Sequence, residues 1–222
     1  MTMRRPLRSA LAVLLASACA AGPAFAADTV ADRVFGASLL SPVTRPVVIE
    51  YRYELKGQTI EQPVSSRVEM AVREVSPEGD KKIWFDMFEG ASRRQFGPTA
   101  AREMNPLVLV FLQRDVTGMG NLTGGASGYF QQQIRKGFGE PAEVTPLEVD
   151  VDGRRVQATR IVMRPFRGDA SIERFPKFRD KAYEFVVAAE VPGGLYRIAS
   201  VTPDAAGGIV LEESMTFARV AP

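Results

Sequence analysis

Apolar residues recur at every second position over residues 47–55, at Val47, Ile49, Tyr51, Tyr53 and Leu55. A period of two places alternate side chains on opposite faces of a β-strand. Most of the intervening positions carry charged side chains, so one face of this strand is apolar and the other is polar. That pattern is typical of an antiparallel sheet with one face in water.

The same alternation predicts strands along most of the chain. They are expected at residues 66–75, 82–89, 92–96, 147–151, 156–163, 183–191, 195–201 and 209–217. Turn signals separate several of them, including Asp152-Gly153 and Pro192-Gly193-Gly194. Together with residues 47–55 this gives about nine strands in one β-rich domain.

A helical insert, at about residues 98–140, interrupts the strands. Asn105 can cap a helix that then carries six apolar residues in a row, 107–112. Such a run wraps all sides of the helix, so the helix must be covered on more than one side. We expect this helix to end at Gly118 and Gly120.

A second helix is expected after a connector that contains Gly124, Gly125 and Gly128. Ser127 can cap it, and Phe130, Ile134 and Phe138 recur every four residues on one face. The predicted fold class is therefore α+β and mainly β. It is a curved antiparallel sheet or half-barrel with a two-helix insert packed on its concave face.

The N-terminal 26 residues read as a secretory signal peptide. A basic start with Arg4, Arg5 and Arg8 precedes an apolar run, and Ala24-Phe25-Ala26 forms a small-x-small cleavage site. Cleavage after Ala26 would place the protein in the periplasm or outside the cell. Cys19 offers an alternative, a lipid anchor, but the usual leucine three places before it is missing. Residues 27–44 are expected to form a linker with a short helical turn, and residues 45–222 form the single domain.

Charge and residue usage exclude several classes of function. The chain has 28 basic and 26 acidic residues, and loss of three leader arginines leaves 25 against 26. A near-neutral mature chain is poor evidence for nucleic-acid binding. There is no His, and the one Cys lies in the leader. Ser-His and Cys-His catalysis and His- or Cys-ligated metal sites are therefore not expected. We expect no cofactor.

Two glycine-containing motifs have structural explanations. Residues 148–153 begin like a calcium-binding EF-hand loop, but Thr159 stands where the twelfth-position glutamate is needed. A hairpin turn fits them better. The stretch 124–128 precedes a helix, as phosphate loops do, but it lacks the Gly-Lys-Ser/Thr ending and is interpreted as a hinge.

Two other features bear on binding. Residues 174–181 interleave four basic residues with Phe175 and Phe178. Arg174, Lys177 and Arg179 could contact an anionic group, or the rings could anchor the loop while the cations face water. Glu213 falls on the apolar face of the last strand, which predicts an ion pair or a functional carboxylate; Arg197 is its expected partner.

A short stretch of the chain resembles the periplasmic lipoprotein-sorting carriers, the Lol-type half-barrel family. The resemblance lies in Val68, Met70, Val72 and Arg73, then Pro77 and Gly79, then Ile83-Trp84-Phe85. In that family a similar strand, basic Pro-Gly turn and aromatic return strand occur together. The resemblance implies a half-barrel that shelters an acyl group beneath helices; it assigns no acyl-binding residue.

Two functions remain open from the sequence, and a third, an enzyme, survives only with carboxylate, Lys, Ser or Tyr chemistry. In the first, a non-enzymatic envelope protein binds a lipid, acyl chain or other hydrophobic ligand under its helical lid. In the second, it is a scaffold or protein-interaction module with a solid core. The residues expected to line the ligand site are Leu109, Phe111, Leu112, Phe130, Ile134, Tyr51, Tyr53 and Trp84.

Overall fold

The computed structural model describes residues 28–221. Nine antiparallel strands form one open sheet in the order β4-β3-β2-β1-β9-β8-β7-β6-β5. Their bounds are β1 Val47–Lys56, β2 Val64–Val75, β3 Lys81–Met87, β4 Arg94–Ala101, β5 Glu143–Val151, β6 Arg154–Met163, β7 Ala182–Val187, β8 Leu195–Pro203 and β9 Ile209–Ala221. The predicted fold class, a curved antiparallel sheet with a helical insert, is confirmed.

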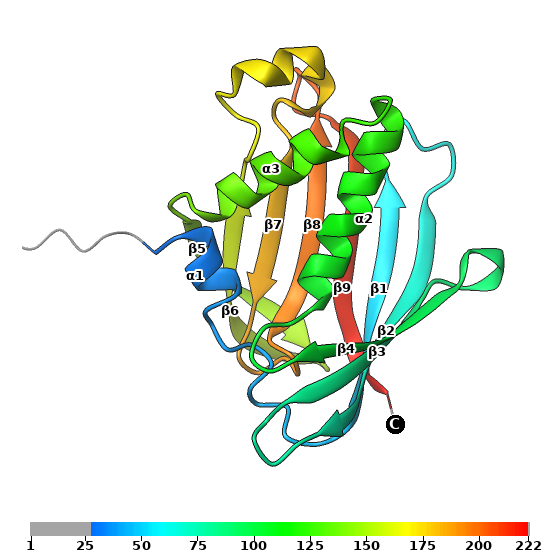
Figure 1. Cartoon of the computed structure of the whole chain (residues 1–222), viewed down its shortest axis with the longest axis vertical. Coiled ribbons are helices and arrows are strands. Elements are labelled where there is room, and N and C mark those ends of the chain that lie inside the picture. Colours follow the sequence, from blue (N-terminus) through cyan, green and yellow to red (C-terminus); the bar gives the residue numbers. More distant parts are fainter. Residues whose placement is uncertain (1–27, 222) are drawn as a thin grey trace, which may run out of the picture.

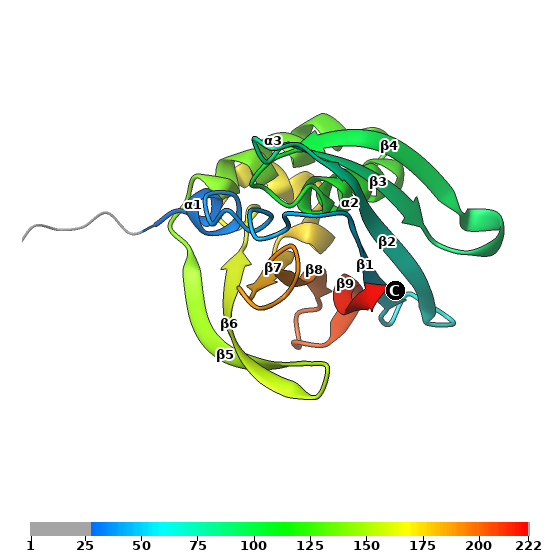
Figure 2. The same ribbon diagram turned by 90° about the horizontal axis from the view of Figure 1, so that it is seen from below.

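The helices are α1 (Val30–Val34), α2 (Leu107–Leu122) and α3 (Ser127–Phe138). Strands β1 to β4 form one meander and β5 to β9 a second, and β9 returns to pair with β1. This order puts β4 and β5 at opposite edges of the sheet. The insert that joins them must therefore cross the width of the sheet, and α2 and α3 cross its concave face (Figures 1 and 2).

The concave face holds the core. The apolar positions of the sequence alternation point to this face: Tyr51 and Tyr53 on β1, Met70 on β2 and Phe85 on β3 are all buried there. The convex face instead carries ion pairs between strands. On it, Arg197 bonds Glu184 at 3.4 Å and Glu212 at 2.7 Å.

Both edge strands carry a proline within their length, Pro98 in β4 and Pro146 in β5. Proline has no N–H to donate and is a common device against edge-to-edge pairing. The edges are thus poor templates for an added strand, which disfavours binding of a peptide by strand addition.

The hairpin prediction at Asp152-Gly153 is confirmed. Val151 pairs with Arg154, and both turn residues have positive φ, 52° and 76°. Two positive φ values define the turn that matches the twist of a two-residue hairpin.

Several expected boundaries differ from the structure. Helix α2 continues through Gly118 and Gly120 to Leu122. Ser127 lies inside α3 and does not cap it, since the helix starts after Ala126 without a side-chain cap. The fourth strand runs on to Ala101, so the insert begins later than residue 98.

Residues 28–44, expected as a linker, pack against the domain. They contain the expected helical turn, α1, in which Val30 and Val34 are buried. The Val30 N–H bonds the Glu140 carbonyl at 3.0 Å, and the Leu40 N–H bonds the Glu103 carbonyl at 2.7 Å. This segment therefore ties together the two ends of the helical insert.

Candidate ligand-binding groove

The inner face of α2 is part of the core. Leu107, Val108 and Phe111 are fully buried, in one apolar cluster with Tyr51 and the other residues of the concave face. They follow each other at helical spacing, so this stripe binds the helix to the sheet. The expected ligand space beneath the six-residue apolar run is filled by these side chains.

The outer side of α2 faces an open groove. Leu109 on α2 is 48% exposed and Phe96 on β4 is 41% exposed, although both are large apolar side chains. The groove between them has a volume of about 920 Å³. We call it the β4 groove; it is lined by Met87, Phe88, Arg94, Gln95, Phe96, Leu109, Val110, Gln113, Arg114, Thr117, Gly118, Asn121 and Glu213.

Phe88 belongs to this groove because the backbone turns there. Its φ is 67°, in the left-handed region that bulky residues rarely adopt. Alternation along the third strand predicts that Phe88 shares a face with Trp84. Instead its ring lies edge-on to Tyr53, with centroids 4.9 Å apart.

Arg114 is one of the charged residues that line the β4 groove. Its Nε donates to Glu213 at 2.5 Å and its Nη2 donates to the Tyr53 hydroxyl at 3.0 Å. The guanidinium carbon lies over the rings of Phe88 and Tyr53, 4.7 and 5.2 Å from their centroids. The Arg114 side chain remains 41% exposed. A fixed cation thus faces an apolar groove.

The pKa values agree with this arrangement. Burial, followed by the nearby Glu213 charge, raises the pKa of Tyr53 to about 12. Burial acts to lower the pKa of Arg114, but Glu213 and Tyr53 outweigh it and the pKa of Arg114 is raised. Tyr53 therefore stays a neutral hydroxyl and Arg114 stays charged at physiological pH.

The expected pairing of Glu213 with Arg197 is wrong. Glu213 pairs with Arg114 instead, and Arg197 points to the convex face, where it bonds Glu184 and Glu212.

A second polar cluster joins α2 to the sheet beneath Asp115. Lys181 Nζ donates to Asp115 Oδ1 at 2.9 Å and to Ser200 Oγ at 3.2 Å. Tyr183 donates its hydroxyl to Asp115 Oδ2 at 2.5 Å, and burial, then the Asp115 charge, raises the pKa of Tyr183. Lys181 and Asp115 are only 1% and 5% exposed. This buried cluster anchors α2 and gives no solvent access to its lysine or serine.

A narrower crevice of about 430 Å³ separates α2 from α3 on their outer side. Leu109 and Leu112 line it from α2, and Ile134 and Phe138 line it from α3. It is apolar, but it has less than half the volume of the β4 groove. Leu109 therefore lies on the ridge between the two hollows.

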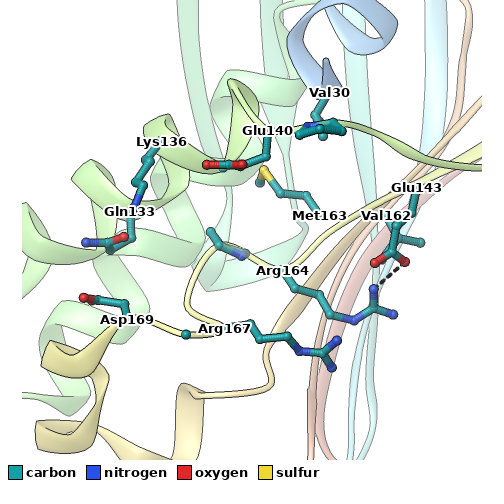
Figure 3. A pocket seen from close by; sticks show the side chains of 14 residues that line it. Val30, Gln133, Lys136, Glu140, Glu143, Val162, Met163, Arg164, Arg167 and Asp169 are labelled. Atoms are coloured by element: carbon teal, nitrogen blue, oxygen red, sulfur yellow. Dashed lines mark hydrogen bonds and ion pairs between the residues drawn. The ribbon is translucent and has the colours of Figure 1, made fainter. Parts of the chain in front are cut away.

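A polar pocket of about 420 Å³ lies at the far end of α3 (Figure 3). Its charged lining residues are Lys136, Glu140, Glu143, Arg164, Arg167 and Asp169. Arg164 is paired with Glu143 at 2.5 Å. Three cations and three carboxylates balance each other, so the charged lining of this pocket has no net charge.

The residues expected to bind a ligand are thus divided among four places. Leu109 lines the β4 groove, while Leu112 and Ile134 line only the crevice between the helices. Trp84 lies on the convex face beneath Arg73, whose guanidinium carbon is 5.0 Å from its ring centroid. The expected residues that are buried in the core are Tyr51, Tyr53, Phe111 and Phe130.

In the segment of residues 174–181, basic side chains lie against aromatic rings. Arg174 lies over Tyr129 and Phe175, and Lys177 lies 4.9 Å from the Phe178 centroid. Arg179 pairs with Glu173 at 2.6 Å. None of Arg174, Lys177 and Arg179 lines the β4 groove. Their contact with an anionic group stays a prediction.

Sequence reasoning missed Phe96, Phe88 and Arg114. Phe96 lies on a mostly exposed strand, and Arg114 lies two residues beyond the apolar run of α2. A cue was available for Arg114, because Glu213 on an apolar strand face required a cation opposite it. The sequence did not show which element supplies that cation.

In the described part of the chain, no group of three or more His, Cys, Asp or Glu residues could hold a metal ion. The helices within residues 28–221 include none with the length and apolar character to cross a membrane.

No protein-family model and no curated protein sequence matches this chain. Among solved structures, it is similar to the lipoprotein LppX of Mycobacterium tuberculosis, with 10% identity, a TM-score of 0.34, and coverage of 84% of this chain and 96% of that chain. It is also similar to a LolA superfamily protein from Nitrosomonas europaea, with 11% identity, a TM-score of 0.28, and coverage of 86% and 92%.

A third similar structure is a domain from Vibrio parahaemolyticus described as outer-membrane lipoprotein-sorting, with 8% identity, a TM-score of 0.25, and coverage of 86% and 92%. The resemblance expected from the sequence, to a Lol-type half-barrel, is thus found again as a likeness of fold. At these TM-scores the likeness carries no argument about a ligand, which rests on the residues of this chain.

Proposed function

We propose that this protein binds a hydrophobic ligand, a lipid or acyl chain, in the β4 groove and performs no catalysis. The observation that carries the proposal is the pair of exposed apolar side chains, Leu109 and Phe96, that face one open groove. Exposed apolar patches on soluble domains commonly mark binding surfaces. The volume of about 920 Å³ also falls in the usual range of about 300–1,000 Å³ for small-molecule sites.

The mode of binding differs from the lid that the sequence predicts. Because the inner face of α2 is packed and Asp115 anchors it to β7 and β8, the helix serves as a fixed wall. The ligand enters from the side, between α2 and β4. If the leader is cleaved after Ala26 as predicted, this binding takes place in the periplasm or outside the cell.

Titration with Nile red, a neutral hydrophobic fluorophore, tests the proposal. Leu109→Gln and Phe96→Ser, which alter opposite walls of the groove, should each weaken binding about tenfold, the factor expected for loss of about 1.4 kcal/mol of apolar contact. Leu122→Gln is the matched control, since Leu122 is a 62% exposed leucine of the same helix that does not line the groove.

Equal binding by Leu109→Gln, Phe96→Ser and the parent protein would contradict this site. If the parent protein binds no Nile red and carries no lipid in native mass spectrometry, the protein is better described as a scaffold or interaction module. The packed inner face of α2 is the observation that favours that alternative.

A further inference from the structure

The charges of the β4 groove are unequal. Among its lining residues, Arg94 and Arg114 are cations and Glu213 is the one carboxylate. An apolar groove with a surplus of one positive charge suits an amphiphile that carries one negative charge. This inequality points to the chemistry of the ligand's head group.

The guanidinium group of Arg114 is held in a fixed orientation and still has a donor available for an anion. Glu213 and the Tyr53 hydroxyl hold its Nε and Nη2, and the rings of Tyr53 and Phe88 lie against its guanidinium carbon. Its Nη1 makes no hydrogen bond within the described residues. The geometry therefore leaves a donor on a preoriented cation, and a preoriented donor loses little entropy when it binds.

Arg94 supplies the unbalanced charge. Its Nη1 donates to the backbone carbonyls of Arg93 at 2.8 Å and Ala91 at 3.5 Å. Within residues 28–221 no carboxylate lies within ion-pair distance of Arg94. Glu213 neutralises Arg114 by contrast, so the net attraction for an anion arises from Arg94.

We infer that the β4 groove binds the carboxylate form of a single-chain fatty acid, with its head group at Arg94 and Arg114 and its chain along Leu109 and Phe96. This inference rests on the proposed function. A volume of about 920 Å³ holds one ligand of drug size, which favours one chain. The single surplus charge matches a monoanion, and Glu213 repels a doubly charged phosphate more strongly than it repels a carboxylate.

The experiment compares oleate with oleyl alcohol, which has the same chain and no charge, by isothermal titration calorimetry at pH 8 with each ligand below its aggregation concentration. The parent protein should bind oleate at least about tenfold more tightly, because a carboxylate accepts stronger, charge-assisted hydrogen bonds from guanidinium groups than a hydroxyl does. Arg94→Gln should reduce the ratio of the oleate affinity to the oleyl alcohol affinity, because it removes the unbalanced charge.

Arg52→Gln is the matched control, since Arg52 lies on the convex face next to the buried Tyr51 and Tyr53. The double variant Arg114→Gln/Glu213→Gln removes both members of an ion pair, so neither charge is left alone in the fold. Combined with Arg94→Gln, it should abolish the remaining preference for oleate while the protein still binds oleyl alcohol.

The outcomes separate the two proposals. Equal affinity of the parent protein for oleate and oleyl alcohol, or a preference for oleate that survives the triple variant Arg94→Gln/Arg114→Gln/Glu213→Gln, would overturn the fatty-acid inference and leave the hydrophobic groove intact. Failure of the parent protein to bind either molecule would overturn both.

Discussion

Two neighbouring residues of α2 connect the helix to the sheet by different chemistry. Arg114 pairs with Glu213 where its side chain is partly exposed, while Asp115 pairs with Lys181 in the core. A buried charge pair contributes little net stability, because both ions lose their hydration. Removal of one partner is costly, because the other charge is then left buried.

The Asp115 cluster gives a direct prediction. Lys181→Met should lower the free energy of unfolding by about 3–5 kcal/mol, because Asp115 loses its cation in a buried site. The double variant Asp115→Leu/Lys181→Met should recover a large part of this loss. Denaturant midpoints measure both, and removal of the exposed Glu74–Lys82 pair (2.7 Å) is the control, with a loss below about 1 kcal/mol. A loss that is equally small for Lys181→Met would show that the cluster is hydrated.

The ion pair between Glu50 and Arg219 makes the free energy of unfolding depend on pH. Its carboxylate accepts two hydrogen bonds from Arg219, at 2.8 and 3.1 Å, and this contact lowers the pKa of Glu50 in the folded protein. A lowered folded-state pKa means that the stabilisation is present above the unfolded pKa, about 4.3. It is lost as the pH falls through the folded value.

The test of Glu50 is a set of unfolding curves between pH 6 and pH 2. Glu50→Gln should flatten the loss of stability below about pH 4 relative to the parent protein. Glu54→Gln should change it less, because Glu54 is more exposed and lies 3.7 Å from its Arg52 partner. Identical pH profiles for Glu50→Gln and the parent would contradict the role of this ion pair.

At the scale of elements, the glycines near the end of α2 have unlike surroundings. A Cβ added at Gly118 would meet open space, whereas one added at Gly120 would lie 1.9 Å from Ser127 Oγ and 3.2 Å from Ser127 Cβ. Gly120 thus marks the close approach of α2 to the start of α3. The sequence suggested a helix end at these residues, but packing against α3 extends the helix.

This difference predicts opposite responses to the same substitution. Gly118→Ala should raise the free energy of unfolding by about 0.5–1 kcal/mol, because alanine favours the helix more than glycine does. Gly120→Ala should lower it, and the added change Ser127→Ala should relieve the clash. Thermal melts of the three variants check this. Equal stabilisation by both single substitutions would show that α2 and α3 do not meet there.

Phe111 and Leu109, like Gly120 and Gly118, lie on the same helix in opposite surroundings. Phe111 is fully buried, so Phe111→Asn opens a void and buries an amide, which should lower stability by about 3–5 kcal/mol. Leu109→Asn changes an exposed side chain and should alter stability by less than about 1 kcal/mol. Chemical denaturation distinguishes them, and comparable losses would place Leu109 in the core.

At the scale of the whole molecule, the strand pattern was largely predictable. Period-two alternation and a turn such as Asp152-Gly153 located the nine strands, because one face of the sheet is buried and the other is wet. The ends of elements were less predictable, since Ser127 and Gly120 depend on contact between two helices. Local patterns carry no information about such contacts.

The candidate site was less predictable than the fold. A six-residue apolar run shows that α2 is covered on several sides, but not which residues face the sheet. The structure buries Phe111 and exposes Leu109, and the opposite wall comes from Phe88 and Phe96. The positive φ at Phe88 breaks the alternation on which the prediction depends.

The most direct test of the central claim, that ligand binds beside α2 and not beneath it, is methyl NMR of the parent protein during titration with a single-chain hydrophobic ligand such as oleyl alcohol. Binding in the β4 groove should shift the methyl resonances of Leu109, Val110 and Met87, which line it, and leave those of Leu107 and Val108 in place. Shifts concentrated at Leu107 and Val108, with Leu109 and Met87 unchanged, would put the ligand beneath the helix and contradict the account.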